Sequence, residues 1–297
     1  MSARLIILLD STHTHFIQSS KPDQEGLGSF KSIPHSELAS WEKEMGQQDI
    51  SQVVISAEPD MLHSDKSHAH TIKEAFEGLG AKVHSLHLAQ ALAYQYLADK
   101  GTVVSQNMIV LYAGDSLLFS IISGGRVIRG QHLLAGNLGE SLLKNPGLEG
   151  DTFQTEPLKN FVSTKGIQRV AGSLIPLFPG ESSLTAKSIS SLSVKELLSA
   201  SESGDQLAED IIRETGKILG MKLADLMSTS SPDHIFIHGP LAALGSPFSQ
   251  STCQSLENNV LTIFKDKVKV QLDAESLPEK VLKGAAVFSS QQEMAVS

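Results

Sequence analysis

The chain of 297 residues has little cysteine, no long apolar run and no cluster of basic residues, and each absence excludes a class of protein. The single cysteine, Cys253, excludes an internal disulfide framework and a zinc site built from several cysteines, and it fits a reducing compartment. No segment approaches the ~20 apolar residues of a membrane span, and the apolar run at residues 5–9 is too short for a signal-peptide core. We therefore expect a cytoplasmic protein with no membrane partner.

The charge balance argues against nucleic acid as a partner. The formal net charge is −9 at pH 7, and no long run of lysine and arginine occurs. Binding that releases counterions from nucleic acid needs clustered basic side chains, so we expect no such groove. A hydrophobic content of 40% is enough for a sizeable core, and the length suits two lobes better than one.

Strands and helices are predicted to alternate along most of the chain. Short apolar runs bounded by turn residues indicate strands, and apolar residues at helical spacing indicate helices. We predict strands at 5–9, 12–19, 53–55, 82–86, 108–112, 117–123, 235–237 and 268–272, and helices at 69–79, 88–98, 205–227, 254–264 and 279–290. This order predicts an α/β fold, divided into an N-terminal lobe at residues 1–105 and a C-terminal lobe at 106–297. The terminal helix, about residues 279–290, could pack back on the N-terminal lobe.

Four motifs follow one another in the second part of the chain. They are Arg129-Gly130 followed by residues 135–140 (AGNLGE), residues 203–208 (SGDQLA), residues 231–239 (SPDHIFIHG) and residues 283–287 (KGAAV). In this order they resemble the ROK family, which comprises bacterial sugar kinases and sugar-responsive repressors. The resemblance covers most of the chain and implies a two-lobed actin-like ATPase (ribonuclease H-like) fold of the ROK sugar-kinase type. Family repressors begin with a helix-turn-helix domain, which we do not expect here because the sequence starts with the first strand.

The catalytic segment of the family, N-D-A-N, matches residues 87–90 (HLAQ). Leu88 then stands where the family has the aspartate that accepts the proton of the sugar hydroxyl, and a hydrocarbon cannot accept a proton. His87 is a candidate for a substitute base, with an ordinary pKa near 6.5. Adjacent helix positions point about 100° apart, so the His87 ring would have to turn into the site. We therefore predict no catalytic base.

Both phosphate loops that the resemblance implies have lost glycines. The first loop matches residues 10–14 (DSTHT), where Asp10 and Thr14 are retained but side chains replace both glycines. His13 could contact an anion there, and the other reading is an ordinary hairpin. The second loop matches residues 114–120 (GDSLLFS), where only Gly114 of the glycines remains.

Two further substitutions weaken nucleotide binding around the second phosphate loop. Asp115 adds a negative charge where phosphates should lie. The adenosine-contacting glycines are reduced to residues 238–240 (HGP), in which Gly239 is kept and the proline removes a backbone donor. Any nucleotide binding would therefore rest on Asp10, Thr14, Gly114, Asp115 and Gly239.

The sugar-binding motif of the family is altered as well. Asn137 and Glu140 match the glutamate and histidine that hold sugar hydroxyls in the family, and both can still hydrogen-bond a hydroxyl. They could equally be surface caps. The cysteine cluster of the family is absent from residues 145–166, so we expect no zinc and no other metal.

Two functional hypotheses follow from the resemblance and from these losses. In the first, the chain is a degenerate family member without phosphoryl transfer, which needs no cofactor and serves as a binding or scaffolding module. In the second, it is an active, divergent ATP-dependent hexose or amino-sugar kinase, which uses ATP and magnesium and gives His87, Asp115 or Glu140 new roles. A repressor role is poorly supported. A small sugar is a possible ligand in either case, and the resemblance alone suggests a homodimer.

Overall fold

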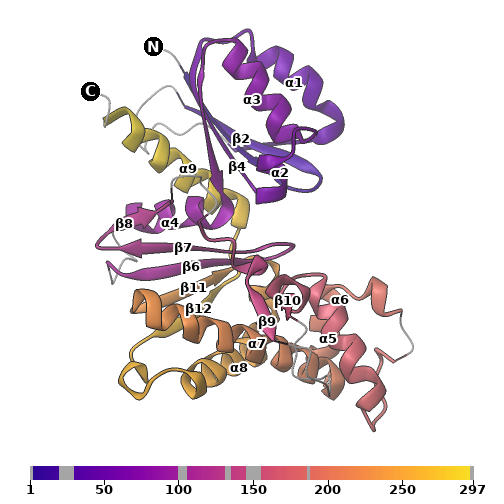
Figure 1. The fold of residues 1–297 in the computed structure, drawn as a ribbon. Coiled ribbons are helices and arrows are strands. Elements are labelled where there is room, and N and C mark those ends of the chain that lie inside the picture. Colours follow the sequence, from indigo (N-terminus) through magenta and orange to yellow (C-terminus); the bar gives the residue numbers. More distant parts are fainter. Residues whose placement is uncertain are drawn as a thin grey trace. The chain divides into compact units, whose positions relative to one another are not determined.

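The computed structural model describes residues 3–19, 30–99, 106–130, 135–144, 155–185 and 188–294. Contacts along the chain divide it into two compact units. Unit 1 comprises Met1–Val104, Arg126–Ala135 and Ser276–Ser297, and unit 2 comprises Ser105–Gly125 and Gly136–Glu275. Unit 1 is therefore assembled from three separate stretches of the sequence (Figure 1).

Each unit is built on a sheet flanked by helices. The elements of unit 1 are β1 (Ala3–Leu9), β2 (His13–Ser19), β3 (Lys31–Pro34), α1 (Leu38–Met45), β4 (Ile50–Ala57), α2 (Pro59–His63), α3 (His68–Gly78), β5 (Lys82–His87), α4 (Leu88–Ala98), β8 (Arg126–Ile128) and α9 (Leu277–Met294). The elements of unit 2 are β6 (Met108–Ala113), β7 (Leu117–Ser123), β9 (Leu142–Lys144), β10 (Thr155–Pro157), α5 (Gly166–Leu174), α6 (Val194–Glu202), α7 (Gln206–Ser230), β11 (His234–His238), α8 (Gly245–Asn259) and β12 (Lys269–Asp273).

The two five-stranded sheets follow the same plan. The first has the order β3-β2-β1-β4-β5, and the second has the order β8-β7-β6-β11-β12 when it is taken from the other end. Strand β8 is an edge strand of the second sheet, although its residues are grouped with unit 1. In each sheet the central strand pairs antiparallel with the next strand of the chain and parallel with a later one. A second parallel strand follows in both. The common plan places the β1–β2 turn and the β6–β7 turn at corresponding points of the two sheets.

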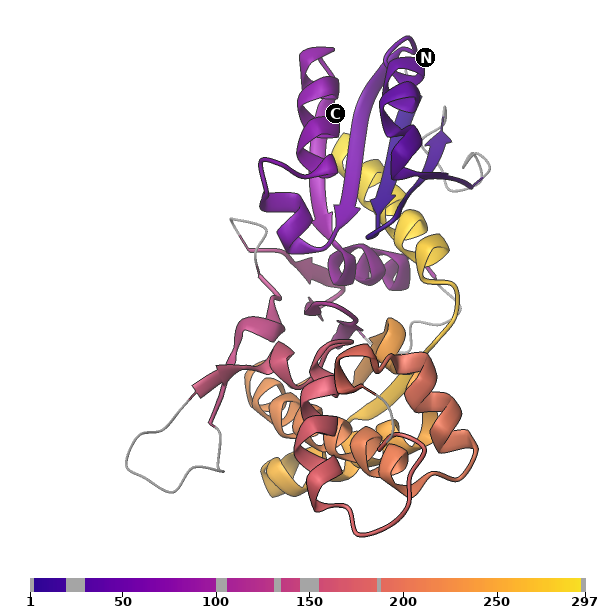
Figure 2. The same cartoon turned by 90° about the vertical axis from the view of Figure 1, so that its right-hand side faces the viewer.

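Both faces of the unit 1 sheet are covered by helices. Alternate residues of β1 and β4 pack with α1 and α3 in one apolar cluster, in which Ile72 and Phe76 are almost fully buried. Helices α4 and α9 pack against each other, and α9 also contacts β1 and β4. Figure 2 shows α9, in yellow, lying along these strands. A Cβ on Gly284 of α9 would lie 2.7 Å from the Ala91 carbonyl carbon, so only glycine allows this helix crossing.

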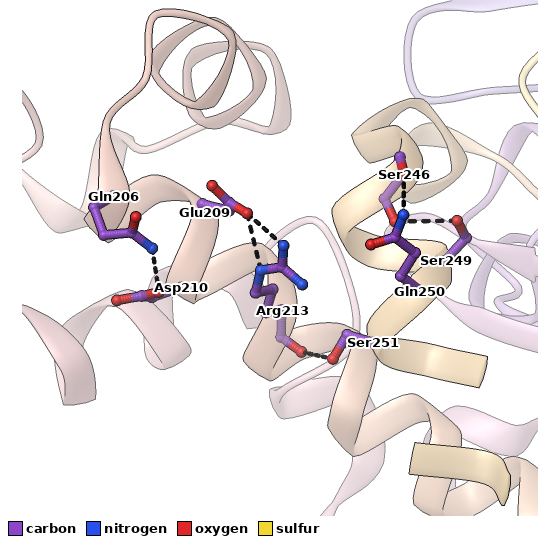
Figure 3. A network of polar contacts seen from close by, with 8 residues as sticks. All are labelled: Gln206, Glu209, Asp210, Arg213, Ser246, Ser249, Gln250 and Ser251. Carbon is purple, nitrogen blue, oxygen red and sulfur yellow. Dashed lines mark hydrogen bonds and ion pairs between the residues drawn. The ribbon is translucent and has the colours of Figure 1, made fainter. Parts of the chain in front are cut away.

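The core of unit 2 is formed by β6 and β11 with the long helix α7 and its neighbour α8. Gly216 and Gly220 of α7 let the two helices approach closely, since a Cβ on Gly220 would lie 2.7 Å from the Ser255 Cβ. The Ser251 hydroxyl donates to the Arg213 carbonyl oxygen at 2.5 Å, and the Arg213 guanidinium pairs with Glu209 on the exposed side of α7 (Figure 3). Small and polar residues thus join these helices where large apolar side chains would not fit.

Several elements differ from the sequence-based predictions. Helix α8 begins at Gly245, whereas the predicted helix begins at residue 254, because the first half of α8 is rich in serine and glutamine and shows little apolar spacing. Helix α1 and the two-stranded sheet of β9 and β10 were not predicted. Among the described residues, no helix has both the length and the apolar character needed to cross a membrane.

Candidate functional site

The β1–β2 turn is closed by the side chain of Asp10. Its Oδ1 accepts the backbone N–H groups of Thr12 and His13, each at 2.7 Å, and its Oδ2 accepts a bond from Nε2 of His15 at 2.8 Å. Burial alone would raise the pKa of Asp10, but these hydrogen bonds outweigh it and lower the pKa to about 2. The carboxylate is therefore ionised at neutral pH and occupies the two amides at the tip of the turn.

Thr14, the other retained residue of this turn, points into the protein. Its side chain is fully buried, and its hydroxyl oxygen has no hydrogen-bond partner among the described residues. A buried hydroxyl cannot reach a ligand in the turn. The turn thus offers a phosphate no unpaired amide at positions 12 and 13, and it adds one negative charge.

The start of α4 holds Leu88 and His87, and both side chains are buried. His87 is the N-cap residue: its Nδ1 accepts the backbone N–H of Gln90 at 3.3 Å. This bond places the ring proton on Nε2, which donates to the carbonyl oxygen of Ala135 at 2.8 Å. Burial lowers the pKa of His87 to about 4, partly offset by the bond to Ala135. Both ring nitrogens are engaged in holding the helix start, so neither has a lone pair for a substrate proton.

The β6–β7 turn of unit 2 carries Gly114 and Asp115. The Gly114 N–H donates to the Ser116 carbonyl oxygen at 3.0 Å, and its own carbonyl oxygen accepts the Thr164 N–H at 2.9 Å. The Thr164 hydroxyl donates to the exposed Asp115 carboxylate. Gly239 follows β11 with a φ of +92°, a conformation that favours glycine. The turn is therefore a hydrogen-bonded hairpin that keeps its acidic side chain at the surface.

Asn137 and Glu140 lie close to the same hairpin. Asn137 precedes the short 3-10 helix Leu138–Glu140, and Glu140 is its last residue. The Phe119 N–H of β7 donates to the Gly136 carbonyl oxygen at 2.7 Å. The Glu140 carboxylate is paired with the Lys159 ammonium group. The Asn137 side chain caps no backbone N–H of the 3-10 helix.

The predicted residues are therefore divided between the two units. Unit 1 holds Asp10, Thr14, His87 and Leu88, and unit 2 holds Gly114, Asp115, Asn137, Glu140 and Gly239. Within unit 2, a Cβ built on Gly139 would lie 3.4 Å from the Cβ of Leu117. The segment 136–140 therefore packs against β7, the strand that follows Gly114.

Sequence reasoning missed an apolar cavity in unit 2. It has a volume of about 700 Å³ and is lined by residues of β9, α5 and α7, among them Leu142, Val170 and Met221. No motif marks it, because these apolar residues come from three separate elements. Across the described ranges, no three His, Cys, Asp or Glu side chains are grouped so that they could hold a metal ion.

Comparisons with known proteins place this geometry in a family. The chain is 21% identical over 190 residues to a glucokinase of Halalkalibacterium halodurans (strain ATCC BAA-125 / DSM 18197 / FERM 7344 / JCM 9153 / C-125), covering 63% of the chain and 58% of that enzyme. The match thus spans less than two thirds of the relative's length.

Solved structures show the same fold. A ROK family glucokinase from Streptomyces griseus, in complex with glucose and AMPPNP, aligns with a TM-score of 0.71 at 19% identity and covers 98% of this chain and 100% of that one. A ROK family transcriptional regulator, a homologue of the E. coli MLC protein, aligns with a TM-score of 0.77 at 18% identity over 99% of this chain and 80% of that one. The predicted two-lobed ROK sugar-kinase fold is confirmed. The sequence profile of the ROK family matches residues 63–292, and the chain belongs to the ROK family.

Proposed function

We propose that this ROK-family, sugar-kinase-like protein does not transfer phosphoryl groups and works as a binding or scaffolding module. The observation that carries the proposal is the start of α4, where Leu88 is buried and the neighbouring His87 uses both ring nitrogens to hold the backbone. A kinase of this type needs a group that accepts the proton of the attacking hydroxyl. Neither residue can supply it in this arrangement.

ATP and magnesium fit these residues poorly. A phosphate-binding turn offers unpaired backbone amides, whereas Asp10 already holds the amides of Thr12 and His13. Asp115 adds an exposed carboxylate to the β6–β7 turn. Each carboxylate would repel a phosphate group at its own turn. We derive no catalytic step through a nucleotide.

A small sugar is the ligand class that the remaining residues support best. The amide of Asn137 can both donate to and accept from a hydroxyl group. The solved relative from Streptomyces griseus binds glucose, and its fold matches nearly the whole of this chain. We therefore propose sugar binding that does not depend on nucleotide.

The test combines turnover and binding measurements on the intact protein. ADP release is measured with ATP, magnesium and a panel of hexoses and amino sugars, and we expect none above the rate without protein. Thermal unfolding is followed with each ligand, since a ligand at a hundred times its Kd adds about 2.7 kcal/mol of stability. We expect stabilisation by one or more sugars and none by ATP.

Two variants sharpen that test. Asn137→Ala should remove the sugar-dependent stabilisation, and Glu209→Gln, on an exposed face of α7, should leave it intact. Turnover by the unaltered protein that His87→Ala abolishes would contradict the proposal and favour a divergent active kinase.

A further inference from the structure

The side chain of Tyr112 fills the space between two glycines of unit 2. A Cβ built on Gly114 would overlap the Tyr112 hydroxyl and lie 2.6 Å from its Cζ atom. A Cβ built on Gly239 would lie 3.0 Å from the Cδ2 and Cε2 atoms of the same ring. The ring is therefore in contact with both backbones, and Tyr112 is only 6% exposed.

The Tyr112 ring lies at the edge of the sheet where ligands bind in many α/β proteins. Tyr112 and His238 are register partners in the parallel pair of β6 and β11, and both stand at the carboxyl ends of their strands. In α/β sheets, ligands bind at this edge, where turns between strands and following segments present their backbone groups. Gly114 and Gly239 begin the two turns concerned.

Tyr112 is not part of the main core of this unit. Its neighbours Leu111 and Ala113 belong to the apolar cluster formed with α7 and α8, whereas Tyr112 does not. Since side chains alternate along a strand, Tyr112 projects from the opposite face of the sheet. A large ring on that face, folded against two glycines, occupies the place that a ligand would need for close approach to the backbone.

We propose that the Tyr112 ring closes the edge of the unit 2 sheet beside Gly114 and Gly239, and that its removal opens this edge to an adenine nucleotide. The proposal rests on the proposed loss of phosphoryl transfer and gives that loss a physical cause in this unit. It concerns binding alone, because Leu88 would still lack a proton-accepting group.

The test is isothermal titration calorimetry with ADP, with and without magnesium, on three proteins. Tyr112→Thr removes the ring and keeps a β-branched residue in the strand, whereas Tyr112→Phe keeps the ring and removes only the hydroxyl. We expect Tyr112→Thr to bind ADP at least tenfold more tightly than the unaltered protein. Tyr112→Phe should bind no better than the unaltered protein.

Several outcomes would contradict the proposal that Tyr112 closes this edge. They are a folded Tyr112→Thr variant with no gain in affinity, an equal gain in Tyr112→Phe, and unaltered protein that already binds as tightly as Tyr112→Thr. If Tyr112→Thr does not fold, as judged by its melting curve, Tyr112→Val replaces it under the same criteria. Turnover by the unaltered protein contradicts the proposed function and is measured separately, so the two failures are distinguishable.

Discussion

The β1–β2 turn of unit 1 and the β6–β7 turn of unit 2 occupy corresponding points of two sheets with one plan, yet they are closed by different means. The first is closed by a charge, because the Asp10 carboxylate holds the amides at its tip. The second is closed by volume, because the Tyr112 ring fills the space beside Gly114. The contribution of a charge depends on pH and is screened by salt, whereas a packed ring has no charge to titrate or to screen. The two turns are thus closed by two independent physical means.

The largest expected change in stability comes from acid, which acts on unit 1 through the protonation of His87. Burial holds the pKa of His87 at about 4 in the folded protein against 6.5 as its ordinary value. The unfolded chain therefore takes up a proton first as the pH falls below 6.5, and the stability present above pH 6.5 is lost progressively down to pH 4. The loss amounts to about 3 kcal/mol, since one pKa unit corresponds to about 1.4 kcal/mol.

Urea unfolding at pH 7.5 and at pH 4.5 measures this loss. His87→Gln should be less stable than the unaltered protein at pH 7.5 and should lose much less stability on acidification. An equal pH dependence in the two proteins would show that His87 is not held neutral in the fold.

A substitution at Gly114 probes closure by volume. Gly114→Ala should lower the free energy of unfolding by about 2 kcal/mol, because the new Cβ overlaps the Tyr112 ring in a packed site. In a Tyr112→Thr background the same change should cost much less, so a double-mutant cycle should give a clear coupling. Gly172→Ala in α5, where a Cβ meets only ordinary contacts at 3.9 Å, is the matched control and should be neutral or stabilising. Additive effects of the two substitutions on the free energy of unfolding would show that Gly114 and Tyr112 do not interact.

A substitution at Asp10 probes closure by charge and should have the smallest effect. Asp10→Ala should destabilise the protein by about 1.5 kcal/mol, since four hydrogen bonds to a partly exposed carboxylate are lost. Asp10→Asn should cost less, because its oxygen can still accept the two amides.

The Asp10 effect should also depend on pH. The folded pKa of about 2 lies below the ordinary 3.8, so the contribution of the carboxylate is present above pH 4 and is lost as the pH falls toward 2. Unfolding of the unaltered protein and of Asp10→Ala between pH 5 and pH 2 should therefore converge. A constant difference across that range would contradict the role given to the ionised carboxylate.

The fold was predictable from the sequence because its signals are local or collinear. The apolar run of β1 and the motifs at residues 203–208, 231–239 and 283–287 each indicate an element at its own position in the chain. The start of helix α8 was predicted nine residues too late, since its serine-rich first half has little apolar spacing and packs through Phe248 against Gly216 of α7. That contact joins residues distant in sequence and leaves no local pattern.

The candidate site was predictable only in part. Leu88 and the missing glycines could be identified by position, but the engagement of His87 depends on Ala135, which lies 48 residues away. Tyr112 gave no signal, since an aromatic residue at the end of an apolar strand is ordinary. Its role depends on the register of β6 with β11, which sets Gly239 beside the ring.

The close crossing of α4 and α9 has a consequence for the order of assembly. Ala91 in α4 meets Gly284 in α9, so unit 1 completes its packing only when a helix that follows every strand of unit 2 has left the ribosome. All strands of unit 2 are synthesised before that point, and domains generally fold as units as they emerge. The unit that begins first along the chain is therefore the one that finishes last.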